Sequence, residues 1–560
     1  MRSDQQQAIN RLAGTSATAF LCAVLCVYPL YIDKFSNLGV TKFTGCFTLF
    51  LLFLLWLVAC TAIGARAPRP RNANAGRDVT LWGVLAFAGT SLISTFTSLS
   101  PTASTWGLGG YYGGLMLVLF TAAGYWAVRS YLDLENLDFV FWVLGITTSI
   151  VAVLYVLNIF NIDLIGAYAD TAVVERAQFF STLGQKDFNG CFFSVALPIV
   201  FYQFLNAKDT RTAVWTGIPA AFGALALAVV DSEALALGIG AAVMVLVCHK
   251  NFTTRHLRRA ALISAAFFGW AAWMHYMRAS VYTQGGTALL AKLGAWQVAL
   301  PCMAASLLLW LVLFVLARKG IAAQAPLYLP GRVITIAVLA VGALAFVLAN
   351  AMPNRPLPES LHNLLVFNDD WGTYRGVAWR AAFGTWADGS LLRKIVGIGP
   401  GMMHTAVAAW AGDAMTARMA TFYAAHNEYL EQLLTTGILG LTAWLLLVAA
   451  HLQRGERSWN TPGVAPVMLA LCSYLAQAVV SIRVSMVFPL VMLLFGALAA
   501  LTAPELPQPA APALRGKKQQ KPEPLPPKNA WYFAKTVLAA VLCMAAASGI
   551  APLLFGFLMG

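Results

Sequence analysis

The chain has 560 residues, of which 59% are hydrophobic and 11% charged, with a mean hydropathy of +0.70 and a formal net charge of +14. A soluble chain cannot bury that much apolar surface, so the composition excludes an ordinary soluble domain. The nine cysteines are scattered and form no C-x-x-C pair, so they indicate neither a disulfide framework nor a metal site.

Apolar runs long enough to cross a bilayer recur along most of the chain. A crossing helix needs about 20 apolar residues and pairs its own backbone polar groups, as lipid requires. The sequence therefore predicts an all-α polytopic membrane protein with about 12–15 transmembrane helices. The expected spans lie near 15–33, 43–64, 79–98, 111–128, 138–159, 187–206, 214–230, 234–248, 259–277, 295–317, 333–351, 436–452, 464–482, 485–503 and 532–557.

Basic residues predict the orientation of these spans. They gather in segments such as 66–77, 250–259, 318–332 and 515–535, which share one side of the membrane. Cytoplasmic loops collect Lys and Arg, so we expect a multi-pass plasma-membrane protein with a cytoplasmic N-terminus. The first span lacks a small-residue cleavage site and is expected to be retained. Topology thus explains the positive charge, and nucleic acid is not an expected partner.

Two candidate substrate-binding residues lie in the first sizeable outer loop. Arg176 is within this loop, and Asn189 stands where the chain enters the next helix. Charged side chains at membrane depth are costly and are therefore candidates for function.

The segment of about 352–436 is the longest part of the chain that does not resemble a membrane span. Connections of this length are usually functional or disordered, and the many aromatic residues here argue against disorder. We expect it to form short helices on the outer face of the helix bundle.

Within that loop, Arg375, Trp379, Phe383 and Trp386 fall on one face of a helix. An arginine fork beside aromatic planes suits a ligand that carries phosphate and sugar. Alternatively, the aromatic residues form an interfacial belt and Arg375 reaches toward lipid headgroups.

The run HNEYLEQLLTTGILG, from His426 to Gly440, closes the loop and leads into an apolar helix. Gly437 and Gly440 are spaced to let a neighbouring helix approach closely. A histidine at this boundary could act as a base, although alone it is more often a cap or an interface residue. Arg483 lies at a tight outer turn and is either a substrate-binding residue or a simple anchor.

The sequence divides into three parts. Residues 1–503 form the membrane domain, and the proline- and lysine-rich segment 504–530 is a cytoplasmic linker. Residues 531–560 form an accessory C-terminal helix. The glycine-rich GIGPG segment at 397–401 follows no strand, so we interpret it as a turn rather than a phosphate loop.

The motif at His426 resembles that of the O-antigen ligase and polymerase superfamily of bacterial membrane glycosyltransferases. The family pattern is His, then Asn, Ser or Gln, nine residues and G-x-x-G. Here His426 and Asn427 are followed by the nine residues Glu428–Thr436 and then Gly437 and Gly440. The segments around Arg375–Trp379 and 397–401 precede the motif in the family's order, and the likeness covers roughly residues 15–503.

The resemblance implies a metal-independent, inverting glycosyltransferase without a cofactor. Its expected partners are a polyprenyl-pyrophosphate-linked glycan donor, a glycan, lipid or protein acceptor, and membrane lipids. His426 and Arg375 are the expected catalytic residues. The histidine is expected to position or deprotonate the acceptor hydroxyl, and arginines are expected to bind the pyrophosphate. Arg176, Asn189, Trp379, Asn427 and Arg483 are the expected substrate-binding residues.

The chain departs from the family at one outer turn. Many members carry Ser-Arg-Gly there, whereas the nearest segment here is Asp231-Ser232-Glu233-Ala234. Arg176 and Arg278 are the candidates to supply the missing charge. The departure also leaves open a non-catalytic member of the family.

A transporter or flippase of lipid-linked glycan is the alternative from another functional class. Transporters carry polar residues and broken helices at mid-bilayer, often in repeated halves. The charged residues here concentrate instead in loops, which favours chemistry at the membrane surface. The acceptor, and the choice between ligase and polymerase, are not determined by the sequence.

Overall fold

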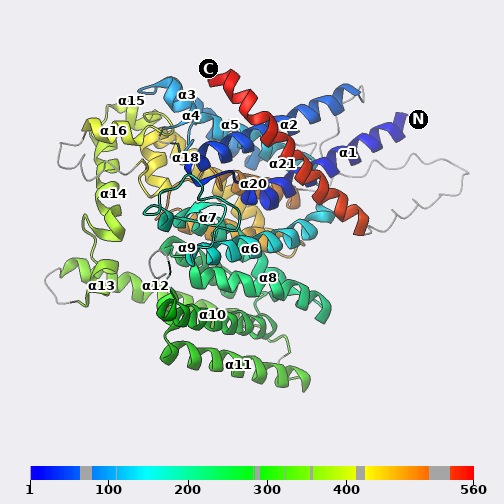
Figure 1. The fold of residues 1–560 in the computed structure, drawn as a ribbon, viewed down its shortest axis with the longest axis vertical. Helices are drawn as coiled ribbons and strands as arrows, with labels where there is room; N and C mark the ends of the chain where they lie inside the picture. Colours follow the sequence, from blue (N-terminus) through cyan, green and yellow to red (C-terminus); the bar gives the residue numbers. More distant parts are fainter. Residues whose placement is uncertain are drawn as a thin grey trace, which may run out of the picture.

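The protein is built almost entirely from α-helices (Figure 1). The computed structural model describes residues 2–63, 78–108, 110–281, 283, 290–321, 323–352, 357–410, 423–503 and 530–559. The expected linker 504–530 lies outside the described residues except for Ala530, and so do most of the basic segments 66–77 and 515–535. The predicted all-α class is confirmed.

The described residues of the first half contain ten α-helices, several short 3₁₀ or π segments and one short hairpin. The two strands are β1 (Phe179–Phe180) and β2 (Gly184–Gln185), which pair antiparallel before α7. The helices are α1 (Arg2–Cys22), α2 (Leu38–Ile63), α3 (Val79–Phe96), α4 (Pro101–Trp106), α5 (Leu115–Tyr131), α6 (Leu137–Ile159), α7 (Lys186–Asn206), α8 (Thr210–Val229), α9 (Glu233–Cys248) and α10 (Thr254–Ser280).

In the second half, the described helices are joined by turns and loops. Its helices are α11 (Trp296–Arg318), α12 (Tyr328–Ala351), α13 (Glu359–Leu365), α14 (Trp371–Ala387), α15 (Leu391–Val396), α16 (Met403–Trp410), α18 (Glu428–Arg457), α19 (Val464–Gln477), α20 (Phe488–Leu501) and α21 (Ala530–Met559).

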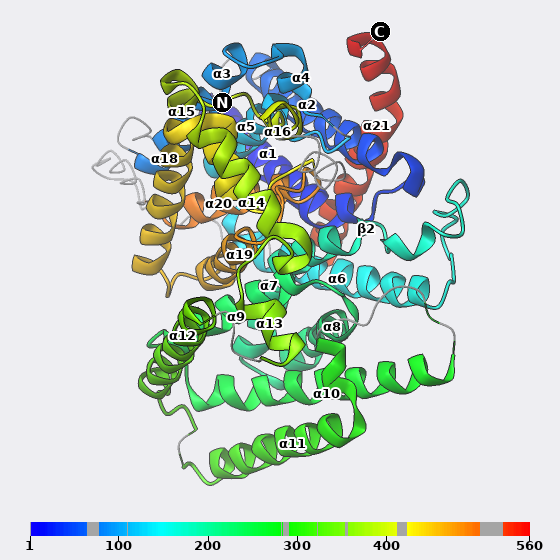
Figure 2. The same cartoon turned by 90° about the vertical axis from the view of Figure 1, so that its left-hand side faces the viewer.

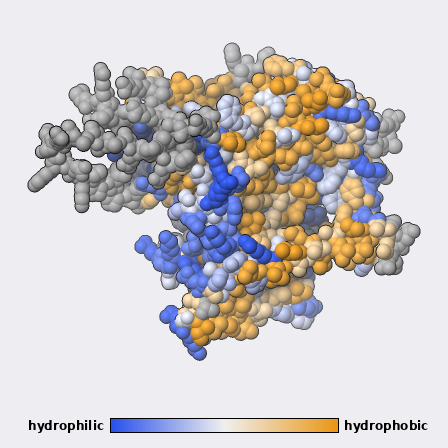
Figure 3. All heavy atoms as spheres, turned by 180° about the vertical axis from the view of Figure 1, so that it is seen from behind, coloured by the Kyte–Doolittle hydropathy of each residue, from blue (hydrophilic) through white to orange (hydrophobic). Residues whose placement is uncertain are grey.

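Ten helices in the described part are long and apolar enough, by length and composition, to cross a membrane. Three shorter apolar helices, α9, α19 and α20, accompany them. Helices α11 and α12 bury little of their surface inside the protein. In Figure 3 hydrophobic residues cover broad areas of one face of the molecule. Such a surface fits a polytopic membrane protein, because lipid can cover it.

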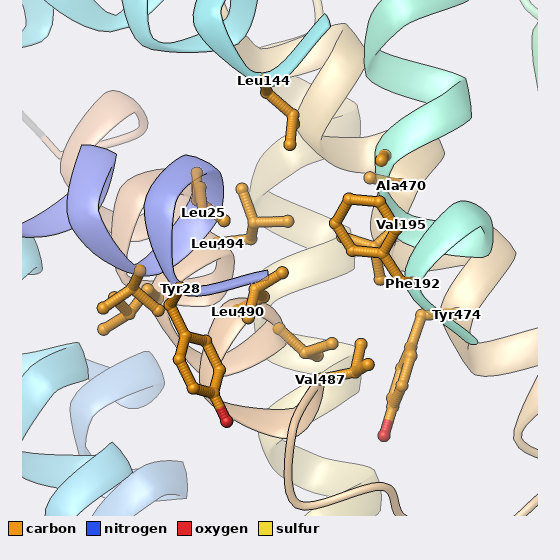
Figure 4. Packing of buried hydrophobic residues seen from close by; sticks show 14 of the residues in the cluster. Leu25, Tyr28, Leu144, Phe192, Val195, Ala470, Tyr474, Val487, Leu490 and Leu494 are labelled. Atoms are coloured by element: carbon orange, nitrogen blue, oxygen red, sulfur yellow. The ribbon is translucent and has the colours of Figure 1, made fainter. Parts of the chain in front are cut away.

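The core lies where α20 is enclosed by other helices. Every residue of α20 is buried, and the helix packs against α5 and α19. In Figure 4, Leu490 and Leu494 point toward Leu25, while Phe192 and Val195 lie beside Ala470. This core holds the ends of α18, α19 and α20 in fixed positions near the site described below.

Helix α1 is interrupted at its C-terminal end, where a short π-helical segment is followed by a 3₁₀ turn that contains Pro29. The fully buried Lys42 donates through Nζ to the carbonyls of Tyr28 at 3.1 Å and Pro29 at 2.9 Å. The Thr182 hydroxyl donates to the same Pro29 carbonyl at 2.7 Å. The break therefore pairs its carbonyls internally, as lipid requires, and anchors the 181–185 turn.

The helices α13, α14, α15 and α16 between α12 and α18 lie at the opposite side of the bundle from the N-terminus (Figure 1). Figure 2 faces this side and shows α13 and α14 in front of the bundle. The predicted short helices within 352–436 are thus present. The predicted span at 436–452 is only part of α18, which begins earlier, at Glu428.

Candidate functional site

His426 lies in a turn directly before α18. Its φ of +50° is in the left-handed region, which non-glycine residues adopt rarely and mostly where surrounding contacts enforce it. Asn427 caps the helix, because its Oδ1 accepts the backbone N–H groups of Tyr429 and Leu430, each at 3.0 Å. The Glu431 carboxylate accepts the N–H of Ala425 at 3.1 Å. The turn is therefore held from both sides.

The environment of His426 keeps its ring neutral. Its pKa is lowered to about 4, mainly by burial and then by the positive charge of Arg375. The carboxylate of Asp187 acts in the opposite direction and raises the pKa. At neutral pH the imidazole is unprotonated and able to accept a proton.

Arg375 lies on α14 and reaches the same region. Its side chain is 12% exposed, and Nη1 donates to the Gly372 carbonyl at 2.8 Å. Nη1 is also 3.6 Å from Glu233 Oε2 at the start of α9. The buried Nε has no hydrogen-bond partner within the described residues. Part of the guanidinium's donor capacity is thus available to a ligand.

The turn that departs from the family pattern lies against this site. Besides the Glu233–Arg375 contact, Asp231 pairs with Lys186 at 3.1 Å, and the Ser232 hydroxyl donates to Asp187 at 3.1 Å. Glu233 itself is 62% exposed, so its ion pair with Arg375 is weak. An acid, Glu233, therefore lies beside Arg375.

Arg278 lies near the same turn. It lines a cavity of about 160 Å³ together with Lys186, Asp231, Tyr155 and Gln185. Its buried Nε also has no hydrogen-bond partner among the residues that are described. The positive charges available around residues 231–233 are thus Lys186, Arg278 and Arg375.

The predicted aromatic face of α14 is divided between two environments. Trp379 donates through Nε1 to the His426 carbonyl at 3.4 Å and packs edge-on to Trp371. Trp386 donates to the Lys394 carbonyl at 3.3 Å, and Phe383 packs beside it while remaining half exposed. Only the Arg375–Trp379 part of this face reaches the His426 turn.

Arg483 is embedded in a polar network at the first turns of α18. Its Nη2 donates to Gln432 Oε1 at 2.7 Å, and its Nε is 3.6 Å from Glu428 Oε2. The guanidinium also lies over the rings of Phe87, Trp444 and Phe488. A small cavity of about 40 Å³, here called the Arg483 cavity, is lined by Arg483, Glu428, Glu431, Tyr111 and Tyr423 among others.

The sequence interpretation missed the two acids of this network. Glu428 is 1% exposed and accepts a hydrogen bond from the Tyr474 hydroxyl at 2.5 Å, while Glu431 braces the His426 turn. Two acids at the start of an apolar helix are costly to bury, and that position was a signal that could have identified them.

The two candidates in the first outer loop make local contacts. Arg176 donates to the Thr171 carbonyl at 3.5 Å and lies over the Tyr168 ring. These contacts do not connect it to His426. Asn189 is fully buried, accepts a hydrogen bond from the Ser181 hydroxyl at 2.6 Å and donates to three carbonyls of residues 180–185. Its geometry favours a role in bracing that turn.

The GIGPG segment forms a turn, as predicted. Gly397, Gly399 and Gly401 all have positive φ. The Gly399 N–H donates to the Thr435 carbonyl at 2.9 Å, two residues before Gly437. Gly437 interrupts α18 with φ 69° and ψ −172°, a conformation essentially restricted to glycine. Gly437 therefore allows an interruption of the helix, at which the α15 segment approaches α18.

We expect Gly437→Ala to destabilise the protein by about 1–3 kcal/mol from backbone strain, because alanine tolerates this conformation poorly. A Cβ at Gly437 would also lie 2.2 Å from the Ile395 carbonyl oxygen. The thermal midpoint of the purified protein should fall clearly. Gly342→Ala in α12 is the control, because a Cβ there meets nothing within 4 Å. Equal midpoints for the two variants would contradict this explanation.

Within the described part of the chain, no group of three or more His, Cys, Asp or Glu residues is arranged to hold a metal ion. No protein-family model and no curated protein matches the chain.

Proposed function

We propose that the protein is a membrane glycosyltransferase that moves a glycan from a polyprenyl-pyrophosphate donor to an acceptor hydroxyl, as a surface-polysaccharide ligase or polymerase does. The observation that carries the proposal is that His426, neutral at physiological pH, lies close enough to Arg375 for this charge to lower its pKa, while the buried Nε of Arg375 has no hydrogen-bond partner among the described residues. The motif from His426 to Gly440 supports the same assignment.

In the proposed reaction, the acceptor oxygen attacks the anomeric carbon of the donor sugar. The new carbon–oxygen bond forms while the bond to the pyrophosphate breaks with inversion. His426 takes the acceptor proton, and the leaving polyprenyl pyrophosphate keeps the electron pair. Arg375 stabilises the developing negative charge, with Lys186 and Arg278 near enough to the 231–233 turn to contribute.

We place the site on the outer face of the plasma membrane, with 12–15 spans and a cytoplasmic N-terminus. The support is the distribution of basic residues and the position of α13 to α16 on the side opposite to the N-terminus. On that side no nucleotide-sugar pool is available, so a preactivated lipid-linked donor supplies the energy.

The test is a reconstituted assay with lipid-linked oligosaccharide in liposomes, scored for two products. We expect transfer to an added acceptor with release of polyprenyl pyrophosphate. Movement of the donor across the bilayer without any transfer product would instead establish the flippase alternative and refute the glycosyltransferase.

The transfer rate should depend on pH through His426. A base works only above its pKa, so the rate should be flat near neutrality and should fall as the pH approaches about 4. Arg375→Gln removes a charge that lowers this pKa, so the acidic limb of the remaining activity should move to higher pH. Initial rates of the wild type and of Arg375→Gln, measured between pH 4 and 8, give the acidic limb of each protein. A wild-type limb near pH 6.5 would show that His426 is not held neutral by burial.

A further inference from the structure

A cavity of about 630 Å³ lies at the opposite end of α18 from His426. Its walls come from the start of α6, the end of α7, the turn 207–209 and the segment 459–466, together with parts of α8 and α10. We call it the Trp142 cavity. It shares no lining residue with the Arg483 cavity or with the cavity beside Arg278. Its size is typical of a binding site.

The Trp142 cavity presents aromatic rings together with hydrogen-bond donors. Its rings are those of Phe141, Trp142, Tyr202 and Trp459. The indole N–H of Trp142, the hydroxyl of Tyr202 and the side-chain amide of Asn206 make no hydrogen bond to another described residue. These donors are therefore available to a ligand that brings hydrogen-bond acceptors.

The charges in the lining are few and of both signs. The ionisable side chains are Asp138, Lys208, Asp209 and His256. The pKa of His256 is lowered to about 4, mainly by burial and then by Arg255 and Arg259, so its ring is neutral at physiological pH. The two arginines donate to carbonyls at the end of α7, among them that of Phe204 at 2.9 Å from Arg259. An anionic ligand would thus meet one lysine and two acids in the lining.

Both ends of the predicted proline-rich linker lie beside the Trp142 cavity. Gly463 in the cavity wall packs against Leu501, the last residue of α20, since a Cβ at Gly463 would lie 3.3 Å from both Cδ atoms of Leu501. At the other end, the ring of Phe533 on α21 is 4.4 Å from that of Phe139, which is 6.3 Å from that of Trp142. Figure 1 shows the start of α21 next to α6. The linker therefore leaves and rejoins the described part of the chain at the rim of this cavity.

The end of the linker has a sequence that suits this lining. Residues 521–528 read KPEPLPPK and place Pro524 and Pro527 in P-x-x-P spacing. This spacing is typical of polyproline II segments, whose carbonyls have no internal partner and whose prolines lack N–H groups. Such a segment presents apolar ring faces and an excess of acceptors, and grooves lined by aromatic rings bind it. Its flanking lysines can pair with Asp138 and Asp209, which are exposed at the rim.

We propose that the Trp142 cavity is a docking site for residues 521–528 of this same chain. Pro527 lies three positions before Ala530, where α21 begins, so about 10 Å of chain joins the two. Because the contact between Phe533 and Phe139 holds the start of α21 beside the cavity, the segment is present there at a high effective concentration. This docking is independent of the proposed function, and its test requires no glycan transfer.

The experiment is photo-cross-linking of the full chain in phosphatidylcholine nanodiscs. The photoreactive amino acid p-benzoylphenylalanine replaces Leu525, which lies between the two prolines of the P-x-x-P. Mass spectrometry then identifies the cross-linked peptides. We expect cross-links to the parts of α6, α7 and the segment 459–466 that line the cavity. Cross-links confined to lipid or to other segments, or no cross-link at all, would overturn the proposal.

Variants of the linker show whether the prolines hold the segment in place. Pro524→Gly with Pro527→Gly should lower the cross-linking yield at least about fivefold, because two apolar anchors and their rigidity are lost. The matched control is Pro507→Gly with Pro509→Gly in the first part of the linker, which should leave the yield unchanged. An equal loss in both pairs would refute the assignment to residues 521–528.

Variants of the cavity test the other partner. Tyr202→Ala should lower the yield at least about fivefold, and Tyr202→Phe should lower it less, because the ring remains and only the hydroxyl donor is lost. Trp126→Ala is the control, since Trp126 is 41% exposed on α5 and lies outside the cavity. An unchanged yield in Tyr202→Ala would contradict the docking. If that variant does not fold, the proline pair decides, because its residues lie outside every described helix.

An anionic lipid headgroup is the other occupant that Lys208 would allow. Nanodiscs of phosphatidylcholine and phosphatidylglycerol in equal amounts should give the same cross-linking yield as phosphatidylcholine alone. A lower yield with phosphatidylglycerol that Lys208→Ala restores would show that lipid displaces the segment, and the proposal would then be wrong.

Discussion

His426→Asn should reduce glycan transfer by about 10²–10⁴-fold while the protein remains folded. The loss follows from removing the group that takes the acceptor proton, since an amide cannot serve as a base near neutral pH. Asparagine is the preferred replacement because it tolerates the left-handed conformation that His426 adopts with φ +50°. Alanine would add backbone strain to the loss of the ring and would confuse the two effects.

The measurement is the initial rate in the reconstituted assay, together with the thermal midpoint of each variant. His275→Asn is the matched control, because His275 lies exposed on α10. It should keep full activity. A His426→Asn protein that folds normally and transfers glycan at more than about a tenth of the wild-type rate would exclude His426 as the base.

Arg375→Ala should reduce transfer by about 10²–10³-fold, because it removes hydrogen-bond donors that stabilise the negative charge developing on the leaving pyrophosphate. Arg375→Lys should recover only part of the activity, because an ammonium lacks the planar fork that binds two oxygens of a phosphate. Arg380→Ala is the control on the same helix. Arg380 is 55% exposed and pairs with Asp369, so its loss should change the rate little.

Glu233 provides a second test of the Arg375 assignment. Its exposed ion pair with Arg375 is worth about 0–1 kcal/mol, which corresponds to at most about a fivefold effect. Glu233→Gln should therefore lower the KM for the lipid-linked donor by up to that factor, because the guanidinium is released toward the pyrophosphate. In the Arg375→Ala background the same change should have no such effect. An identical response in both backgrounds would show that Glu233 does not act through Arg375.

The ion pair between Arg483 and Glu428 has a different character. Glu428 is almost completely buried, and its carboxylate also accepts from Tyr474, so removing Arg483 would leave a buried charge without its cation. Its burial and its three aromatic neighbours indicate that Arg483 supports the first turn of α18. The sequence could not distinguish this role from that of an anchor, because Glu428, Gln432 and Tyr474 are brought to it only by packing.

The predicted helix at Arg375–Trp386 is present as α14, and the predicted turn at 397–401 is present as well. Both were predictable because helix periodicity and glycine turns are local properties of a sequence. The predicted span starts too late for α18, because the first turn of this helix, from Glu428 to Gln432, is polar and does not resemble a membrane span. The burial of that turn depends on α19 and on the 482–486 segment.

The sequence by itself determined the all-α class, the positions of the apolar helices and the motif that singles out His426. These depend on the length of apolar runs and on the spacing of residues along one segment. Only the tertiary structure decided which charges surround that histidine. Asp187 and Arg375, which act on the imidazole, come from two separate helices, and Glu233 on a third helix pairs with Arg375, so the site requires those helices to be packed together. Burial likewise has no local signature, so the low pKa of His426 could be recognised only in the fold.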